Sequence, residues 1–222
     1  MRPPDSAERL ARLHASAAAL ELSLDDSVAT LLLHYLDLLN RWNATYNLTA
    51  IRDPDQMLVQ HVVDCLSVIN PLRRRLGART GARVLDVGSG GGLPGAIIAM
   101  LCPTVDVTCV DTVGKKAAFI QQVSTQLRLT NLHARHERVE HLQAEPFQIV
   151  TSRAFASLSD FTGLTRPLLA ADGAWMAMKG KRPVSELAEL DPSALLFHVE
   201  QLTVPGLNAE RCIVWMQPTP SL

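Results

Sequence analysis

Hydrophobic and polar positions follow one pattern before about residue 80 and another after it. The first part places apolar residues at helical spacing, most clearly over 24–42, whereas in the second part short apolar runs alternate with helical segments. Strand-like runs lie at 83–87, 105–110, 131–137, 147–150, 173–178, 197–204 and 211–216. Alternating strands and helices are typical of an α/β fold with a mostly parallel sheet. The last two runs suit an antiparallel hairpin at the sheet edge.

We therefore expect an N-terminal helical extension over 1–80 and an α/β core over 81–222, joined as one compact unit. A chain of 222 residues with 47% hydrophobic content can bury the core of one such domain plus an appendage. Residues before about 20 favour a frayed helix without a strong apolar face. Ser23 and Asp26 offer a capping-box-like start for the second helix, and Asp53-Pro54 opens a third.

A glycine cluster follows the first predicted strand. A dinucleotide fingerprint that starts at Gly88 requires glycines at 88, 90 and 93, but position 93 is Leu93, and no P-loop motif is present. Pro94 suits the first position of a following helix. What remains is a glycine-lined slot around Gly88 and Gly90 with Asp86 at its entrance. Such a slot suits a ligand with an amino-acid head and no phosphate, and S-adenosylmethionine is such a ligand.

A second acid supports this ligand class. Asp111 ends the second predicted strand 23 residues after Gly88, close to the spacing of about 20 expected for a carboxylate that binds ribose hydroxyls. The alternative is that Asp111 only ends a strand. Beyond the third strand, Val139 could pack on an adenine face while Glu140 and backbone amides address its edge. Alternatively, Glu140 only lies near the start of a helix, where its charge is favourable.

Basic residues gather at three places in the sequence. Arg73, Arg74, Arg75, Arg79 and Arg83 form one run, which is either a solvated face or a phosphate contact. Lys115 and Lys116 begin the helix after Asp111. Lys179, Lys181 and Arg182 follow the fifth strand on the ligand side of the sheet and favour an anionic substrate. Arg153 could bind the methionine carboxylate or an RNA phosphate, or be an ordinary surface arginine.

Two further segments carry polar residues that allow two interpretations. The stretch 40–49 is dense in Asn, Thr and aromatic residues, so it forms either a helix end or a wall of the substrate pocket. His61 and Asp64, three residues apart, make an ordinary helix pair. His133, His136 and His141 lack partners at metal-ligand spacing, so we expect surface histidines and no metal.

Composition limits the partners and the cellular compartment that we expect for this protein. The net charge of −1 does not favour tight binding to bare RNA. No apolar run reaches transmembrane length and the N-terminus lacks a signal-like apolar core, so we expect a cytoplasmic protein with no membrane contact. The four cysteines form no Cys-x-x-Cys pair, and we expect buried reduced thiols.

Taken together, these motifs resemble the bacterial 16S rRNA guanine-N7 methyltransferase family, RsmG or GidB, from about residue 20 to the C-terminus. The segments that carry the resemblance are Arg41-Trp42-Asn43, Tyr46-Asn47-Leu48-Thr49, Asp86-Val87-Gly88-Ser89-Gly90, Gly92-Leu93-Pro94-Gly95, Arg138-Val139-Glu140 and Ser152-Arg153-Ala154-Phe155-Ala156. The glycine motif alone is shared by most methyltransferases, whereas the combination is specific. Gly91 is a mild departure, since variation that includes proline is expected there.

The resemblance implies a seven-stranded Rossmann-like class I methyltransferase sheet with an antiparallel last strand. It implies S-adenosylmethionine as cofactor, S-adenosylhomocysteine as product, and guanine 527 of 16S rRNA as target, in the small ribosomal subunit or its precursor. The family's cofactor contacts fall on Gly88, Leu93, Val139, Glu140 and Arg153, and Asp111 matches its acid after the second strand. We expect a monomer.

Guanine N7 carries a lone pair in its neutral form, so attack on a sulfonium methyl group needs no general base. Catalysis then depends on in-line alignment and exclusion of water, and we expect no single carboxylate to be essential for the chemical step. Two rival functions fit parts of the same sequence. One is a methyltransferase that acts on a protein or small molecule, and the other is a catalytically silent RNA-binding assembly factor that keeps a vestigial pocket.

Overall fold

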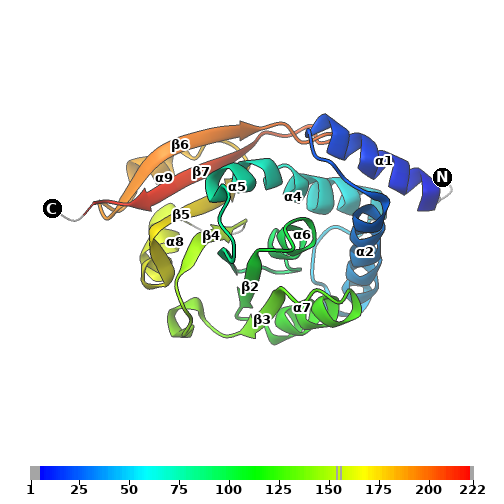
Figure 1. The fold of residues 1–222 in the computed structure, drawn as a ribbon, viewed down its shortest axis with the longest axis horizontal. Helices are drawn as coiled ribbons and strands as arrows, with labels where there is room; N and C mark the ends of the chain where they lie inside the picture. The colour runs from blue at the N-terminus through cyan, green and yellow to red at the C-terminus, as the bar shows by residue number, and fades with distance from the viewer. Residues whose placement is uncertain (1–5, 154, 156, 221–222) are drawn as a thin grey trace.

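The computed structural model describes residues 6–153, 155 and 157–220. Its centre is a seven-stranded sheet in the order β3-β2-β1-β4-β5-β7-β6 (Figure 1). The strands are β1 Arg83–Val87, β2 Asp106–Asp111, β3 Leu132–His136, β4 Phe147–Ser152, β5 Leu169–Lys179, β6 Ala194–Leu202 and β7 Arg211–Pro218. Neighbours from β3 to β5 pair in parallel, and β7 is antiparallel to both β5 and β6. The mostly parallel sheet with an antiparallel last strand is therefore confirmed.

Both faces of this sheet are covered, which explains why the central strands β1, β2 and β4 are buried at nearly every position. In β1, Val84 belongs to one cluster of buried side chains and Leu85 to the other. Successive strand residues point to opposite faces, so a strand buried on both sides shows no polar alternation. The helices of the core are α6 Gly95–Leu101, α7 Gly114–Gln126, η2 Val139–His141, α8 Leu158–Thr165, η3 Arg166–Leu168 and α9 Val184–Ala188.

The N-terminal segment folds into helices that pack on the core. They are α1 Ser6–Ala19, α2 Asp26–Tyr46, α3 Pro54–Met57, the π-helix η1 Leu58–Val63, α4 Asp64–Leu66 and α5 Ile69–Leu76. Figure 1 shows α2 running beside α7, and the Tyr35 hydroxyl donates to Gly91 O at 2.7 Å. Leu32 of α2 and Ile97 of α6 belong to the same cluster of buried side chains. The boundary near residue 80 stays a prediction.

Several sequence-based details need correction. Helix α1 does bury an apolar edge, Leu13 and Ala17, although its sequence pattern is weak. Helix α2 is capped by Asp25, whose side chain accepts from Val28 N at 2.8 Å, and not by Ser23. Pro94 is the N-cap of α6 and not its first residue. For the starts of α2 and α6 the error is one or two residues, because several adjacent residue types can begin a helix.

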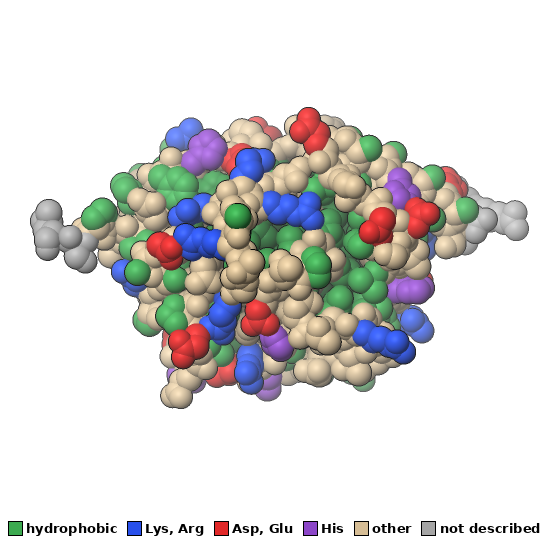
Figure 2. Space-filling model, viewed as in Figure 1, with side chains coloured by type: hydrophobic (Ala, Val, Ile, Leu, Met, Phe, Trp, Pro, Cys, Tyr) green, Lys and Arg blue, Asp and Glu red, His purple; other side chains and the backbone are tan. Residues whose placement is uncertain are grey.

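The arginine run near residue 75 lies on α5, in the loop that follows it and at the first residue of β1. Arg73 donates to Leu101 O at 2.7 Å, Arg74 pairs with Glu200, and Arg79 pairs with Asp172 at 2.6 Å. Figure 2 shows basic side chains over the region of α5 with acidic side chains among them. Partners within the protein and a position away from the carboxyl ends of the strands favour the solvated face over a phosphate contact.

Two other expectations concern single residue types. All four cysteines are buried and free, as expected for reduced thiols. His133 and His136 are exposed, and His133 pairs with Asp106 at 2.6 Å. Within the part of the chain that the structure describes, no group of three or more His, Cys, Asp or Glu side chains is arranged to hold a metal ion.

No described helix has both the length and the apolar character required to cross a membrane.

Candidate functional site

Two cavities flank the glycine loop that follows β1. Cavity A, of about 310 Å³, lies over the carboxyl ends of β1 and β2 and is closed by η2 and by Phe155 and Leu164. Cavity B, of about 190 Å³, lies on the other side of the loop, against Leu48, Thr49 and Arg153. Gly88 lines both cavities. The sheet therefore presents its site where open α/β sheets bind ligands, outside the carboxyl ends of the strands.

The backbone of the glycine loop requires residues without a side chain. Gly88 and Gly90 adopt φ angles of 65° and 58°, a region that L-residues with a Cβ rarely enter. A Cβ added at Gly88 would meet no atom within 4 Å, so the backbone there faces open space. Gly88 N donates to Val110 O at 2.9 Å and thereby ties the loop to β2. The loop is a rigid turn that exposes its backbone to both cavities.

Asp111 ends β2 and also lines cavity A. Its carboxylate is 5% exposed and accepts from Gly90 N and Val113 N, each at 2.9 Å. Lys116 Nζ lies 3.8 Å from the same carboxylate. A carboxylate has about four lone-pair sites, so both oxygens retain the capacity to accept from a ligand. The two interpretations of Asp111 are therefore compatible: it fixes the loop and faces the cavity.

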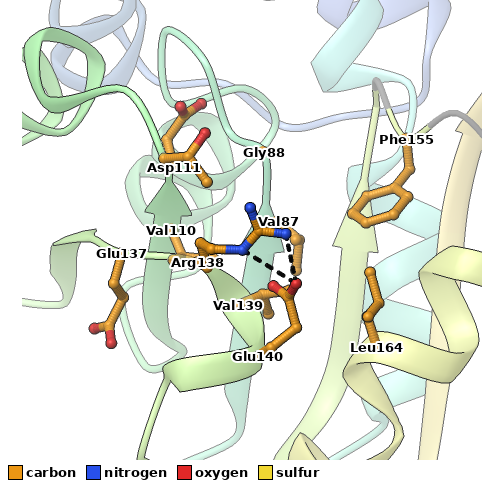
Figure 3. Close-up of a pocket in the computed structure, with 11 residues that line it drawn as sticks. Val87, Gly88, Val110, Asp111, Glu137, Arg138, Val139, Glu140, Phe155 and Leu164 are labelled. Carbon is orange, nitrogen blue, oxygen red and sulfur yellow. Dashed lines mark hydrogen bonds and ion pairs between the residues drawn. The ribbon is translucent and has the colours of Figure 1, made fainter.

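The far side of cavity A is formed by Val139 and Glu140 on η2 (Figure 3). Val139 is 6% exposed, and Figure 3 shows Phe155 and Leu164 across the cavity from it. The Glu140 carboxylate is held by Arg138 at 2.9 Å. A hydrogen bond from its own backbone N–H, together with Arg138, holds the pKa of Glu140 below its ordinary value. Cavity A thus has apolar walls, with the Asp111 carboxylate at one end and the Glu140 carboxylate at the other. This arrangement suits a planar ring joined to a diol.

Asp86 does not lie at the entrance of the slot, so this expectation was wrong. Its side chain is fully buried and lines neither cavity A nor cavity B. Asp86 Oδ2 accepts from Gly95 N at 2.8 Å, which fixes the start of α6 beneath the loop. Asp86 Oδ1 has no hydrogen-bond partner among the described residues, and burial raises the pKa of this carboxyl to about 7.

Asp86→Asn is expected to flatten the dependence of stability on pH. A folded-state pKa near 7 lies above the unfolded value of 3.8, so between these values only the folded state holds the proton. Stability of the wild-type protein should then fall by about 1.4 kcal/mol per pH unit across pH 4.5–6.5 from this group alone. Urea unfolding at several pH values measures the difference between the two proteins. Equal pH slopes would contradict the assignment.

Gly95 is closely enclosed at the start of α6. A Cβ there would lie 2.4 Å from Cys109 Sγ and 2.9 Å from Asp86 Oδ2, both buried. We expect Gly95→Ala to lower the free energy of unfolding by about 1–3 kcal/mol through overpacking. The matched control is Gly163→Ala in α8, where a Cβ meets nothing within 4 Å. Alanine in that helix should be neutral or stabilising by up to about 1 kcal/mol, and similar losses in both variants would exclude the packing explanation.

Arg153 is not an ordinary surface arginine. Its side chain is 26% exposed and lines cavity B. Arg153 NH1 donates to Gln60 O at 3.1 Å and lies 3.4 Å from Asp64 Oδ2. The neighbouring His61 bonds Thr49 Oγ1 through Nε2 at 2.9 Å. Burial and the nearby Arg153 guanidinium lower the pKa of His61 to about 4, so this imidazole is neutral at physiological pH.

The segment 40–49 forms the predicted helix end, and two of its residues also line a cavity. Asn43 is 2% exposed, accepts from Thr49 N at 2.8 Å and donates to Ile51 O at 3.0 Å, which builds the turn after α2. Leu48 and Thr49, held by that turn, line cavity B. His61 and Asp64 turn toward Arg153 and do not form the helix pair that their spacing predicts. Sequence spacing found these two residues and missed their partner, because Arg153 lies about 90 residues further along the chain.

The basic side chains near the site differ in what surrounds them. Lys116 lines cavity B, whereas Lys115 points to solvent from the same first turn of α7. Lys179 is bound to Glu186 at 2.7 Å and to Phe155 O at 3.3 Å. Lys181 and Arg182 are exposed beyond the carboxyl end of β5. Leu93 lines cavity B, and Ala154 and Ala156 of the predicted motif lie outside the described residues.

Comparison with known proteins matches this arrangement to a family. The family described as "GidB: rRNA small subunit methyltransferase G" matches residues 29–214. The ribosomal RNA small subunit methyltransferase G of Leptothrix cholodnii (strain ATCC 51168 / LMG 8142 / SP-6) is 60% identical over 206 residues, which cover 93% of this chain and 94% of that protein. The protein of the same name from Acidovorax sp. (strain JS42) is 56% identical over 213 residues, with coverages of 93% and 94%.

Solved structures agree on the fold. The N-methyltransferase NodS from Bradyrhizobium japonicum WM9, solved in complex with S-adenosylhomocysteine, superposes with a TM-score of 0.56 at 12% identity. The match covers 82% of this chain and all of that one. The fold is the Rossmann-like class I methyltransferase fold. By the extent and identity of the sequence matches, the chain belongs to the GidB family, rRNA small subunit methyltransferase G.

Proposed function

We propose that this protein transfers a methyl group from S-adenosylmethionine to N7 of a guanine in 16S rRNA, guanine 527 in the conventional numbering. The observation that carries the proposal is family membership over residues 29–214, which include the whole glycine loop and both cavities beside it. The product is S-adenosylhomocysteine. The substrate is the small ribosomal subunit or its precursor, which also implies a cytoplasmic location, and we propose that the protein acts as a monomer.

Cavities A and B together suit the parts of this cofactor. The adenine would lie between Val139 and Phe155, with Glu140 at its edge, and the ribose hydroxyls would bind Asp111. The methionine part would follow the Gly88–Gly90 backbone into cavity B, beside Leu93. Arg153, at the inner wall of cavity B, would bind the methionine carboxylate. Asp86 supports this site from beneath the loop, since it lines neither cavity.

The protein does not have to remove a proton from guanine N7 before this atom attacks the methyl group. The cofactor supplies a methyl group on a sulfonium, and neutral guanine N7 presents a lone pair. His61 is already neutral, and Asp86 is buried beneath the loop, so neither has to act as a base. The residues around cavity B therefore contribute by orienting the two substrates and by excluding water. Such positioning can lower a barrier by roughly 7–11 kcal/mol at best.

Exposed cations near the site suit an RNA backbone. Lys115 on α7 and Lys181 and Arg182 after β5 lie at the carboxyl side of the sheet and point to solvent. Contacts of this kind attract phosphate without reading sequence. With a net charge of −1 overall, the protein is better suited to a folded particle that is recognised partly by its shape than to extended RNA.

The experiment that tests this proposal follows labelled methyl groups from S-adenosylmethionine into small subunits that lack the native modification. We expect the label in 16S rRNA and not in the ribosomal proteins or in small molecules. Label in protein would favour the rival methyltransferase. Cofactor binding without transfer to any of these fractions would favour a silent assembly factor.

A further inference from the structure

A third cavity adjoins the site on the side away from the adenine pocket. Cavity C, of about 360 Å³, lies between the N-terminal helices and the ends of β5 and β7. Its polar lining comes from Asp64 and His61 on one side and from Lys179 and Arg211 on the other. Arg153 lines both cavity C and cavity B, so the two spaces share one guanidinium group as a wall.

One buried carboxylate organises this wall. Asp64 is 2% exposed, and its Oδ1 accepts from Arg211 Nε at 2.9 Å while its Oδ2 lies 3.4 Å from Arg153 NH1. The two arginines therefore share a single carboxylate, which fixes the distance between their guanidinium groups. Arg211 is also fixed by a hydrogen bond from NH1 to its neighbour, Glu210 O, at 2.8 Å.

The backbone on the opposite side contributes to the same geometry. Gln60 lies within the π-helix η1, and its carbonyl accepts from Arg153 NH1 at 3.1 Å. Single π-helical turns occur frequently at functional sites, and here the turn brings Gln60 and Asp64 to one guanidinium group. The N-terminal helices thus hold a side chain that comes from the end of β4, and they complete the site rather than merely cover it.

The charges around cavity C do not balance. Among the described residues that line it, Arg153, Lys179 and Arg211 are cations and Asp64 is the only carboxylate. Glu186, outside the lining, compensates Lys179 at 2.7 Å, so one positive charge remains in excess. Partly buried positive charge in excess of its partners attracts an anion. A planar guanidinium suits a phosphate group in particular, since it can donate two parallel hydrogen bonds.

We propose that cavity C binds a phosphate group of the target nucleotide, with Arg211 as a direct contact and Asp64 as the positioning residue that spaces Arg211 and Arg153. This inference rests on the proposed function. A base that enters cavity B to meet the methyl donor carries its own phosphate within one nucleotide, and cavity C is the neighbouring space across Arg153. Free phosphate has the same chemistry, so the test must separate the two sources.

The test compares binding of guanosine 5′-monophosphate, guanosine and inorganic phosphate by calorimetry in the presence of S-adenosylhomocysteine. The wild-type protein should prefer the nucleotide over the nucleoside by about 10-fold or more. Arg211→Gln and Asp64→Asn should each remove most of this preference. Asp55→Asn is the matched control: this aspartate also binds arginines, Arg9 and Arg12, but lies on α3 away from the cavity. It should keep the wild-type preference.

Methyl transfer to small subunits provides a second readout. Arg211→Gln should raise KM for the subunit with little change in kcat, keep cofactor affinity within about twofold, and reduce the salt dependence of subunit binding by about one phosphate contact. Arg211→Lys should restore part of the loss. An unchanged nucleotide preference in Arg211→Gln, or inorganic phosphate binding as tightly as the nucleotide, would overturn the inference. Failure of the wild-type protein itself to methylate rRNA would instead overturn the proposed function.

Discussion

Arg153→Gln is expected to lower kcat/KM for methyl transfer by about 100- to 1,000-fold, the largest effect of any substitution considered. The guanidinium lines cavities B and C at once and lies 3.4 Å from the buried Asp64 carboxylate. Glutamine removes charge-assisted hydrogen bonds worth about 1.5–3 kcal/mol each and leaves Asp64 with Arg211 alone. The measurement is single-turnover methyl transfer to small subunits, together with cofactor affinity.

Two controls separate this role from a general loss of charge or folding. Arg79→Gln removes an arginine that pairs with Asp172 near the amino end of the sheet, and it should leave transfer unchanged. Arg153→Lys keeps the charge but loses the planar fork, so it should recover only a small part of the activity. Activity of Arg153→Gln within about 10-fold of wild type, in a folded protein, would contradict the placement of Arg153 in the site.

Asp111→Asn is expected to weaken S-adenosylmethionine binding by about 10- to 150-fold, equivalent to about 1.5–3 kcal/mol for hydrogen bonds to a charged group. The amide keeps the shape of the carboxylate. It replaces one oxygen with an NH2 group, which then faces the Gly90 N–H or the Val113 N–H and no longer accepts from the ribose hydroxyls. Isothermal titration with S-adenosylmethionine and S-adenosylhomocysteine measures the loss.

A ligand lacking the ribose 2′-hydroxyl identifies the contact itself. The wild-type protein should bind 2′-deoxy-S-adenosylhomocysteine more weakly than the normal product, whereas Asp111→Asn should show little further loss. The difference between the loss for both changes together and the sum of the two separate losses measures the coupling between Asp111 and that hydroxyl. If the two losses simply add, Asp111 acts only by fixing the glycine loop.

The sequence was sufficient to predict the part of the fold in which local pattern and local chemistry agree. The run 83–87, the glycine turn after it and Asp111 at the end of the next strand form β1, the loop and the end of β2 as expected. Each of these signals spans only a few residues, and glycines with positive φ leave a direct mark in the sequence. The pattern also marked seven strand-like runs and an antiparallel pair at the sheet edge, which the structure forms as β6 and β7, whereas the class of sheet followed from the family resemblance.

The directions of side chains, and contacts between residues far apart in the sequence, could not be predicted from local sequence patterns. Asp86, next to last in β1, points toward the start of α6 and not toward the slot, which depends on the face of the sheet that its side chain meets. Lys116 and not Lys115 turns to cavity B, because adjacent helical residues point about 100° apart. Asp64 meets Arg153 and Arg211 only after the chain has folded across 89 and 147 residues. No local pattern encodes such contacts.

Chemical mapping of the modified nucleotide tests whether the protein methylates one guanine of 16S rRNA at N7. Small subunits lacking the native modification are incubated with the protein and S-adenosylmethionine. The rRNA is then cleaved chemically at N7-methylguanine, and the cleavage site is read by primer extension. We expect a single new cleavage at guanine 527 of 16S rRNA that depends on both protein and cofactor. Transfer of label to rRNA without this cleavage, or cleavage at another guanine, would contradict it.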